Sequence, residues 1–388
     1  MRPAARTAEL HPYVFAEVGR KLQQMKSQGI DIINLGIGSP DLPPPPVVIE
    51  TLCRAVLRPD SHGYGGYYGL PALRRAVVGY YSRRFGVQLD PDTEVAILIG
   101  SKEGIFNICM AFLDRGDVSL VPDPGYPTYS AGTHMAGGVR YAIPLREEDG
   151  FLPNLASVPG DVARSAKMLW LNYPNNPTGS IASREFLEHA VDFARRNDLL
   201  LCYDNPYCDV TFDGYRAPSL LEIPEAKQVA LEFNSLSKTC NMAGWRVGMA
   251  VGNREAVEML SRVKTNVDSG VFKPIQEAAV AALEGDESWV RERNAVYQAR
   301  RDVVMGWLAA CGLEAATPKA TLYVWARLPG GVRSWDYSMR VLDATGVWLA
   351  PGSAFGDNGE GFVRISLTSP QDRLLEAGQR LARCKDLV

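Results

Sequence analysis

The chain has 388 residues, more than a single hydrophobic core usually supports, so two domains are expected. Its 46% hydrophobic and 22% charged residues are typical of a globular protein, and a net charge of −3 gives no basis for binding nucleic acid or an anionic membrane. No apolar run approaches the roughly 20 residues that span a bilayer, and the N-terminus lacks the apolar region of a secretory signal, which predicts a cytoplasmic protein.

Residues 46–285 alternate between short apolar runs rich in β-branched residues and amphipathic stretches. One amphipathic stretch, residues 183–197, begins with Ser183 as a helix N-cap and Glu185 in the first turn. Strands that alternate with helices at this spacing predict crossover units and a largely parallel sheet. The predicted strands are Val95–Ile99, Val118–Val121, Lys167–Leu171, Leu199–Tyr203, Val229–Phe233 and Arg246–Val251.

Residues 286–388 have the pattern of a smaller α+β unit. A long helix is expected from Glu287 to Ala310, and a polar helix is expected at the C-terminal end. Between them, alternation of apolar and polar residues predicts strands at Thr321–Arg327 and Gly361–Leu367.

The domain boundary follows from the proline run Pro43–Pro46, which separates the first 45 residues from what comes next. We therefore expect an α/β protein with a large domain at residues 46–285 and a small domain made of residues 1–45 and 286–388. Ligands of such sheets bind at the carboxyl ends of the strands, and the candidate functional residues follow predicted strands.

One lysine follows a predicted strand in a context that suggests covalent chemistry. The strand ends in Ser235-Leu-Ser-Lys238, and the chain then passes through glycine to Arg246. An amine that is desolvated beside a cation has a lowered pKa and attacks a carbonyl carbon to form an imine. Ser235, Ser237 and Arg246 supply donors that a phosphate dianion needs. A solvated surface charge is the simpler interpretation of Lys238 alone, but its neighbours favour the catalytic one.

A carboxylate follows another strand. Asp204 is the first acidic residue after the apolar run Leu199–Tyr203. A buried aspartate needs a cation or a protonated ring beside it, and a pyridinium nitrogen meets that need while the ring serves as an electron sink. Tyr207 is placed to hydrogen-bond a phenolic oxygen of the same ring. The alternative interpretation of Asp204 is a helix N-cap.

Three further strand ends carry polar or aromatic candidates. The amide of Asn176 is placed to reach the same phenolic oxygen, although Asn-Pro-Thr-Gly is also ordinary turn chemistry. Ser101 and Lys102 begin a helix after a strand, where backbone amides and the serine hydroxyl form an anion site. Tyr126 stands on a proline-rich loop and is suited to stacking on a flat ring.

Arg364 interrupts the apolar strand Gly361–Leu367. A structural salt bridge would explain an arginine there, and capture of a substrate carboxylate is the functional alternative. By contrast, the four histidines, His11, His62, His134 and His189, are too few and too dispersed to predict a metal site.

In this order, Asn-Pro-Thr-Gly, Asp-x-x-Tyr, Ser-x-Ser-Lys, Gly-Trp-Arg-Val-Gly and a late arginine resemble the class I/II aminotransferases, which use pyridoxal 5′-phosphate (PLP) in fold type I. The resemblance covers nearly the whole chain and implies a large domain with a mostly parallel seven-stranded sheet. The group that it resembles most is LL-diaminopimelate aminotransferase, through the stretches Asn34–Gly38, Gly100–Gly104, Phe212–Tyr215, Lys264–Asn266 and Lys319–Thr321.

The resemblance also implies roles. Lys238 would hold PLP as a Schiff base and shuttle protons, Asp204 would pair with the ring nitrogen, and these two with Tyr207 would be the catalytic residues. Asn176 and Tyr207 would bind the phenolic oxygen, and Tyr126 would stack on the ring. The implied phosphate ligands are Ser101, Lys102, Ser235, Ser237 and Arg246.

Tyr64, in the glycine-rich stretch 62–69, matches a tyrosine that family members lend to the phosphate of the neighbouring subunit. This implies a homodimer with shared active sites.

The implied substrate site contains Gly38, Asn176 and Arg364, with Arg364 binding the α-carboxylate. Three sites depart from the family pattern. Asn205-Pro206 precedes Tyr207 where the family often has Asn-Ala, and the other two lie near the substrate. Ser39 replaces an acidic residue, and Lys273 stands where relatives often carry an amide, so both bear on preference for the distal end of the substrate.

The expected activity is transfer of an amino group between an L-amino acid and a 2-oxo acid, with 2-oxoglutarate and glutamate as one pair. LL-diaminopimelate is a candidate donor, which would place the enzyme in lysine biosynthesis. Aspartate-, alanine-, aromatic- and methionine-type aminotransferases are alternatives, because all their substrates present the same α-carboxylate. PLP-dependent carbon–sulfur β-lyases use the same fold and are a second alternative, and a non-catalytic binding module is a third.

Overall fold

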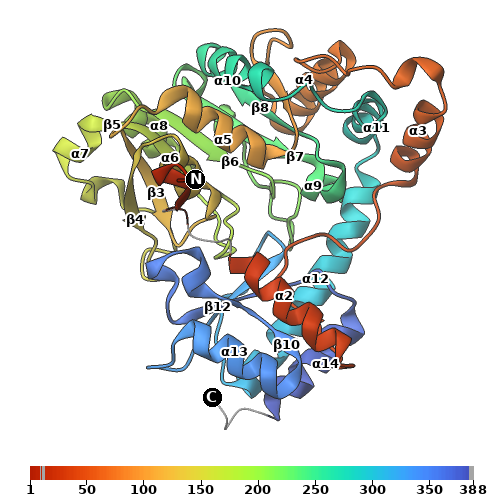
Figure 1. Ribbon diagram of the computed structural model, residues 1–388, viewed down its shortest axis with the longest axis vertical. Coiled ribbons are helices and arrows are strands. Elements are labelled where there is room, and N and C mark those ends of the chain that lie inside the picture. Colours follow the sequence, from red (N-terminus) through yellow and green to blue (C-terminus); the bar gives the residue numbers. More distant parts are fainter. Residues whose placement is uncertain (9, 11–13, 384–388) are drawn as a thin grey trace.

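The computed structural model describes residues 1–8, 10 and 14–383, so His11 lies outside the described residues. Figure 1 shows an upper lobe built on a large sheet and a lower lobe formed mainly by the C-terminal part of the chain. Within the described residues, no helix combines the length and apolar character that crossing a membrane requires.

The large sheet has seven strands in the order β2-β8-β7-β6-β5-β3-β4. All neighbouring pairs are parallel except those of β8, which is antiparallel to β2 and β7. The predicted mostly parallel seven-stranded sheet is therefore confirmed. The strands are β2 (Val95–Leu98), β3 (Val118–Asp123), β4 (Val139–Pro144), β5 (Ala166–Leu171), β6 (Leu200–Asp204), β7 (Ala230–Ser235) and β8 (Gly248–Gly252).

The large sheet differs from the sequence-based prediction in one additional strand and in strand ends that shift by one or two residues. β4 was not predicted, because this edge strand is half exposed and lacks the continuous apolar run of its neighbours. β8 begins at Gly248 rather than at Arg246, which lies in a left-handed conformation (φ 58°) after a short 3₁₀ turn.

Helices cover both faces of the sheet. Successive residues of a strand point to opposite faces, so Ile97 packs in one hydrophobic cluster and Leu98 in another. One face is covered by α5 (Ser101–Phe112), α6 (Thr128–Met135) and α10 (Arg254–Val267). The other is covered by α3 (Pro46–Val56), α4 (Pro71–Phe85), α7 (Gly160–Ser165), α8 (Arg184–Arg196) and α11 (Lys273–Glu284). The predicted N-cap is present, because the Ser183 side chain accepts a hydrogen bond from Phe186 N.

The lower lobe has its own core and a three-stranded antiparallel sheet, ordered β11-β12-β9. The long helix α12 (Ser288–Leu308) runs from the upper lobe into it (Figure 1). Its remaining elements are β9 (Tyr323–Arg327), α13 (Ser334–Thr345), β11 (Ala350–Pro351), β12 (Phe362–Ser366) and α14 (Gln371–Ala382).

The N-terminal segment contacts both lobes. The short helix α1 (Ala5–Ala8) lies against α6 of the upper lobe, where the carbonyl oxygen of Arg6 is 2.8 Å from His134 Nε2 (Figure 1). The elements that follow pack on the lower lobe: Val18 and Leu22 of α2 (Val14–Ser27) belong to the same small cluster as Trp348, and β1 (Ile33–Asn34) pairs in parallel with β10 (Val347–Trp348). The chain then crosses between the lobes, so residues 36–42 run past the carboxyl ends of the central parallel strands.

Candidate active site

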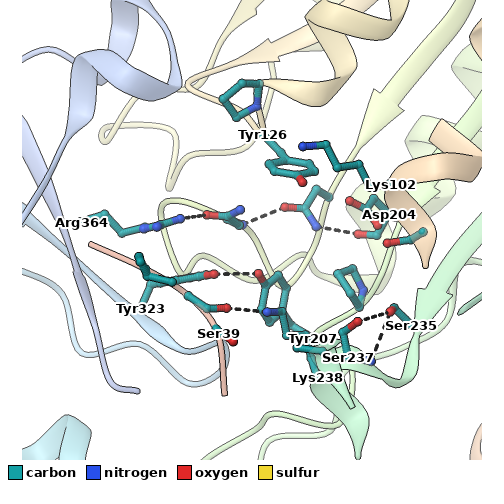
Figure 2. A pocket seen from close by; sticks show the side chains of 18 of the residues that line it. Ser39, Lys102, Tyr126, Asp204, Tyr207, Ser235, Ser237, Lys238, Tyr323 and Arg364 are labelled. Carbon is teal, nitrogen blue, oxygen red and sulfur yellow. Dashed lines mark hydrogen bonds between the residues drawn. The ribbon is translucent and has the colours of Figure 1, made fainter. Parts of the chain in front are cut away.

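A cavity of about 390 Å³ lies at the carboxyl ends of the central strands. All predicted site residues except Tyr64 line it. Its lining contains four cationic side chains and one carboxylate, Asp204, which suits an anionic ligand. The predicted residues brought together here are Gly38, Ser101, Lys102, Tyr126, Asn176, Asp204, Tyr207, Ser235, Ser237, Lys238, Arg246 and Arg364. Figure 2 shows Lys102, Tyr126, Asp204, Lys238 and Arg364 around this cavity.

Lys238 belongs to α9 (Leu236–Thr239), the short helix that directly follows β7. Burial and the positive charges of Arg364 and Arg246 lower the pKa of Lys238 to about 7. Its Nζ donates a hydrogen bond to the carbonyl oxygen of Gly38. A substantial fraction of this amine is therefore neutral at pH 7, which is the nucleophilic form.

Asp204 is the last residue of β6 and is 4% exposed. Its Oδ2 accepts a hydrogen bond of 2.6 Å from the Tyr129 hydroxyl, whereas its buried Oδ1 has no partner within the described residues. Burial raises the pKa of Asp204 to about 7. A cationic N–H group at Oδ1 would remove the cost of burying the charge, which is the chemistry of a protonated pyridine nitrogen. The alternative of a helix N-cap is not observed, because the recorded donor to this carboxylate is a side-chain hydroxyl.

The predicted phosphate ligands meet at the start of α5. Gly100 has φ 72°, and a Cβ there would lie 2.2 Å from Nη2 of Arg246, so glycine lets the guanidinium approach the helix N-terminus. Arg246 Nη1 also donates to Ser237 Oγ at 3.5 Å, and Ser235 Oγ donates to Ser237 Oγ at 2.9 Å. Burial and the charge of Arg246 lower the pKa of Lys102. A dianion bound here would offset the repulsion between the two cations.

Arg364 approaches the cavity from β12 in the lower lobe. Its Nη1 donates to Asn176 Oδ1 and its Nη2 to the carbonyl oxygen of Gly36, both at 2.7 Å. The guanidinium carbon lies 4.1 Å from the ring centroid of Tyr323 and 4.6 Å from that of Phe355. Two rings and two oxygen acceptors thus hold a planar donor that is suited to a carboxylate.

Three residues in or directly behind the cavity wall, Tyr129, Asn172 and Tyr323, were given no role by sequence reasoning. Tyr129, in the first turn of α6, supports Asp204 and stacks on Trp170. Asn172 donates to the Asp204 carbonyl oxygen at 2.6 Å and accepts from Asn176 N at 2.7 Å. The Tyr323 hydroxyl lies 2.9 Å from the Tyr207 hydroxyl. Tyr129 follows the predicted Tyr126 by less than one helical turn, and this spacing is the sequence signal that could have placed Tyr129 near the site.

Tyr64 lies outside the cavity and is 86% exposed. The loop that carries it is held by the buried side chain of Gln276, which donates to Gly65 O at 3.3 Å and accepts from Leu70 N at 2.6 Å. Lys273 lies near the same loop and donates to the carbonyl oxygen of Asp60 at 3.2 Å. Tyr64 therefore does not contribute to the cavity of its own chain.

Across residues 1–8, 10 and 14–383, no group of three or more His, Cys, Asp or Glu side chains is arranged to hold a metal ion.

Comparison with known proteins gives consistent matches over the whole chain. The model of the family "Aminotransferase class I and II" matches residues 30–381. LL-diaminopimelate aminotransferase of Desulforudis audaxviator is 49% identical over 381 residues, which is 98% of this chain and 97% of the relative.

Solved structures agree on the fold. Apo-BacF from Bacillus subtilis superposes with a TM-score of 0.96 and 38% identity, covering 99% of this chain and 98% of that one. A probable N-succinyldiaminopimelate aminotransferase from Thermus thermophilus superposes with a TM-score of 0.90 and is 40% identical. The match covers 95% of this chain and 99% of that one. The chain therefore belongs to the class I and II aminotransferases of PLP fold type I and is a PLP-dependent transaminase.

Proposed function

We propose that this enzyme transfers an amino group between LL-diaminopimelate and 2-oxoglutarate. The observation that carries the substrate assignment is the near-full-length identity of 49% to a relative of that name. The charge of the cavity is compatible with it, because two dicarboxylic substrates would alternate in a site lined by cations.

The residues of the cavity fit PLP. The unpartnered Oδ1 of Asp204 is suited to the ring nitrogen, and the neutral form of Lys238 is suited to the covalent link. The predicted phosphate ligands offer hydroxyls, helix N-terminal amides and cations. When bound, PLP supplies a conjugated ring that withdraws electrons from the substrate α-carbon.

In the proposed mechanism the residues of the cavity divide the work. Arg364 would bind the α-carboxylate and fix the substrate in the cavity. Asp204 would keep the ring nitrogen of PLP protonated, while Asn176 and Tyr207 would donate hydrogen bonds to its phenolic oxygen. Lys238 would hold PLP in the resting enzyme and, as a neutral amine, would take the substrate α-proton as a general base and then serve as a general acid.

Other activities share this machinery. The Thermus relative is named for a succinylated diaminopimelate, so a blocked distal amine is a specific alternative donor. Aspartate-, alanine-, aromatic- and methionine-type transamination require the same contact to Arg364. A carbon–sulfur β-lyase would also need the same cofactor residues and would differ only in the fate of the substrate side chain.

A donor panel tests the proposal. The purified enzyme is incubated with 2-oxoglutarate and each donor in turn, and glutamate formation is measured. LL-diaminopimelate should give the highest kcat/KM, with the meso isomer and N-succinyl-LL-diaminopimelate as matched controls for stereochemistry and the distal amine. A higher kcat/KM for a control or for a protein amino acid would overturn the substrate assignment. Steady pyruvate release from cystathionine without glutamate formation would favour the β-lyase.

We further propose a cytoplasmic homodimer with shared active sites, in which Tyr64 reaches the phosphate of the partner. Support comes from the exposed aromatic side chains Tyr64, Tyr67 and Tyr68 on one loop, which suit burial against a second copy. The proposed domains are residues 46–285 and residues 1–45 with 286–388. The two main hydrophobic clusters support this division, and Tyr207, Val210 and Phe212 of the large domain join the cluster of the lower lobe. Sedimentation analysis tests the dimer, because a monomer at micromolar concentration would contradict it.

A further inference from the structure

Tyr323 lies where four proposed site residues meet. It is the first residue of β9, in the lower lobe, and is 2% exposed. Its hydroxyl is 2.9 Å from the Tyr207 hydroxyl, and its ring lies beneath the guanidinium of Arg364 at 4.1 Å. A Cβ on Gly38 would lie 1.8 Å from the Tyr323 hydroxyl, so glycine is required there to admit the tyrosine. The same Gly38 accepts the hydrogen bond from Lys238.

The backbone holds Tyr323 in place. Its N–H donates to Thr321 Oγ1 at 3.2 Å, and Thr321 has φ 77°, a conformation that a β-branched residue adopts only when its surroundings enforce it. In Figure 2, Tyr323 projects from the lower-lobe side toward Tyr207, which belongs to the upper lobe. The hydroxyl pair therefore bridges the side of the cavity that binds substrate and the side that binds the cofactor ring.

The hydroxyl pair has a required direction. Each tyrosine has one proton to donate, and either can be the donor in the recorded contact. If Tyr207 donates to the phenolic oxygen of the cofactor, then the proton between the two hydroxyls must come from Tyr323. Burial, followed by the proximity of Tyr323, raises the pKa of Tyr207 well above its usual value, so it keeps its proton. The charged groups that line the cavity around this pair are Arg364, Asp204 and Lys238.

We infer that Tyr323 is a positioning residue: it supports Arg364 with its ring and directs Tyr207 toward the cofactor with its hydroxyl. A hydroxyl that accepts a hydrogen bond becomes a stronger donor itself, so the chain from Tyr323 through Tyr207 strengthens the contact to the phenolic oxygen. The contact of Arg364 with Asn176 gives a first connection between the substrate carboxylate and that oxygen, and Tyr323 gives a second. This inference rests on the proposed roles of Arg364 and Tyr207.

The hydroxyl is tested by a double-mutant cycle of Tyr323→Phe and Tyr207→Phe in the PLP-loaded enzyme. The readout is the pH titration of the cofactor absorbance, which reports the proton on the lysine-linked nitrogen. Donors to the phenolic oxygen stabilise its negative charge most when that nitrogen is deprotonated, so losing a donor raises the apparent pKa. Tyr323→Phe should raise this apparent pKa by about 0.5, which corresponds to part of the free energy of one hydrogen bond. Tyr207→Phe should raise it further, and the double variant should equal Tyr207→Phe alone.

The ring is tested by comparing Tyr323→Leu with Tyr323→Phe. Leucine removes the aromatic face beneath Arg364 and should raise KM for 2-oxoglutarate about 10-fold, the scale of a buried cation–π contact, whereas phenylalanine should change it less than about 3-fold. An unshifted titration in Tyr323→Phe, additive shifts in the cycle, or equal KM values for the two variants would overturn the inference. Failure of the proposed cofactor site is distinguishable, because the wild-type protein would then show no titrating cofactor band.

Discussion

The cavity wall at the ends of β5, β6 and β7 and the loop at residues 62–69 are built in opposite ways. The wall is made of buried side chains on packed strands, and among the described residues that line the cavity at these strand ends, the atom without a partner is Oδ1 of Asp204. The loop presents tyrosines to solvent, and Gln276 holds its backbone through Gly65. A buried polar atom without a partner specifies the chemistry of its ligand, whereas an exposed tyrosine specifies only that a partner surface is needed.

The same contrast holds for electrostatics. In the wall, burial moves two pKa values toward neutrality from opposite sides: that of Lys238 falls to about 7 and that of Asp204 rises to about 7. Both residues thus become able to gain or lose a proton near physiological pH, and a bound cation or anion shifts them strongly. The wall is therefore sensitive to ligand charge in a way that the solvated loop is not.

The largest effect is expected when the amine of Lys238 is removed from the cavity wall. Lys238→Ala should lower kcat on the order of 10⁴-fold or more, because both the covalent link and the general base are lost. Glutamate formation from the best donor measures it. Lys167→Ala removes an exposed lysine from β5 and is the matched control, which should keep wild-type turnover. Near-normal turnover in Lys238→Ala would show that another base acts in the wall.

The next largest effect is expected for Asp204, where catalysis and the stability of the apoprotein should change in opposite directions. Asp204→Asn removes the charge but keeps an acceptor for Tyr129, and should lower kcat about 10²- to 10³-fold because the ring nitrogen loses its counter-charge. The folded-state pKa of about 7 is above the unfolded value, so the carboxylate destabilises the apoprotein increasingly as pH rises from about 4 to 7. At pH 8 the asparagine apoprotein should therefore melt a few degrees above wild type, and this difference should vanish near pH 4.

Calorimetry of apo and PLP-loaded forms checks this prediction. PLP should stabilise wild type more than Asp204→Asn. An apoprotein variant less stable than wild type at pH 8 would mean that the buried carboxylate already has a cationic partner.

Sequence patterns were most informative about the wall. Polar residues stand at or soon after the ends of β5, β6 and β7, and parallel strands bring those ends to one edge, so Asp204, Asn176 and Lys238 could be grouped without coordinates. The edge strand β4 was missed, because a half-exposed strand lacks the apolar run that marks its neighbours. The sheet was thus predictable where burial is complete on both faces and not where it is partial.

Supporting contacts were less predictable. Tyr129 and Tyr323 are aromatic residues among many, and their value depends on where a hydroxyl points, which strand and helix periodicity do not specify. Gln276 supports the loop from a helix far along the chain, so its pairing with Leu70 has no local sequence signature. These roles arise from tertiary packing, in contrast to the strand-end residues, which are marked by their position.

A smaller effect is expected for Tyr129, which contacts Asp204 from behind the cavity wall. Tyr129→Phe removes the hydrogen bond that lowers the pKa of Asp204 and leaves the stacked ring in place. The pKa of Asp204 should rise further, so the pH below which apoprotein loses affinity for PLP should move upward by about 0.5 to 1, as expected for one hydrogen bond. The dissociation constant of PLP, measured from pH 6 to 9, reports this, and Tyr141→Phe on the edge strand β4 serves as control. An unchanged pH profile would exclude Tyr129 as a support of Asp204.

The smallest effect is expected in the loop at residues 62–69. It tests whether Tyr64 contributes to the active site of the partner subunit. Tyr64→Phe should weaken PLP binding about 3- to 10-fold, the net value of one ordinary hydrogen bond, without changing the melting temperature of the apoprotein. Tyr67→Phe, on the same loop, is the matched control. Mixing Tyr64→Phe subunits with Lys238→Ala subunits sharpens the test. In a mixed dimer the intact lysine belongs to the Tyr64→Phe chain and would face the intact Tyr64 of the Lys238→Ala chain. That cofactor site should regain wild-type affinity, and a site that stays weakened would show that Tyr64 acts within its own subunit.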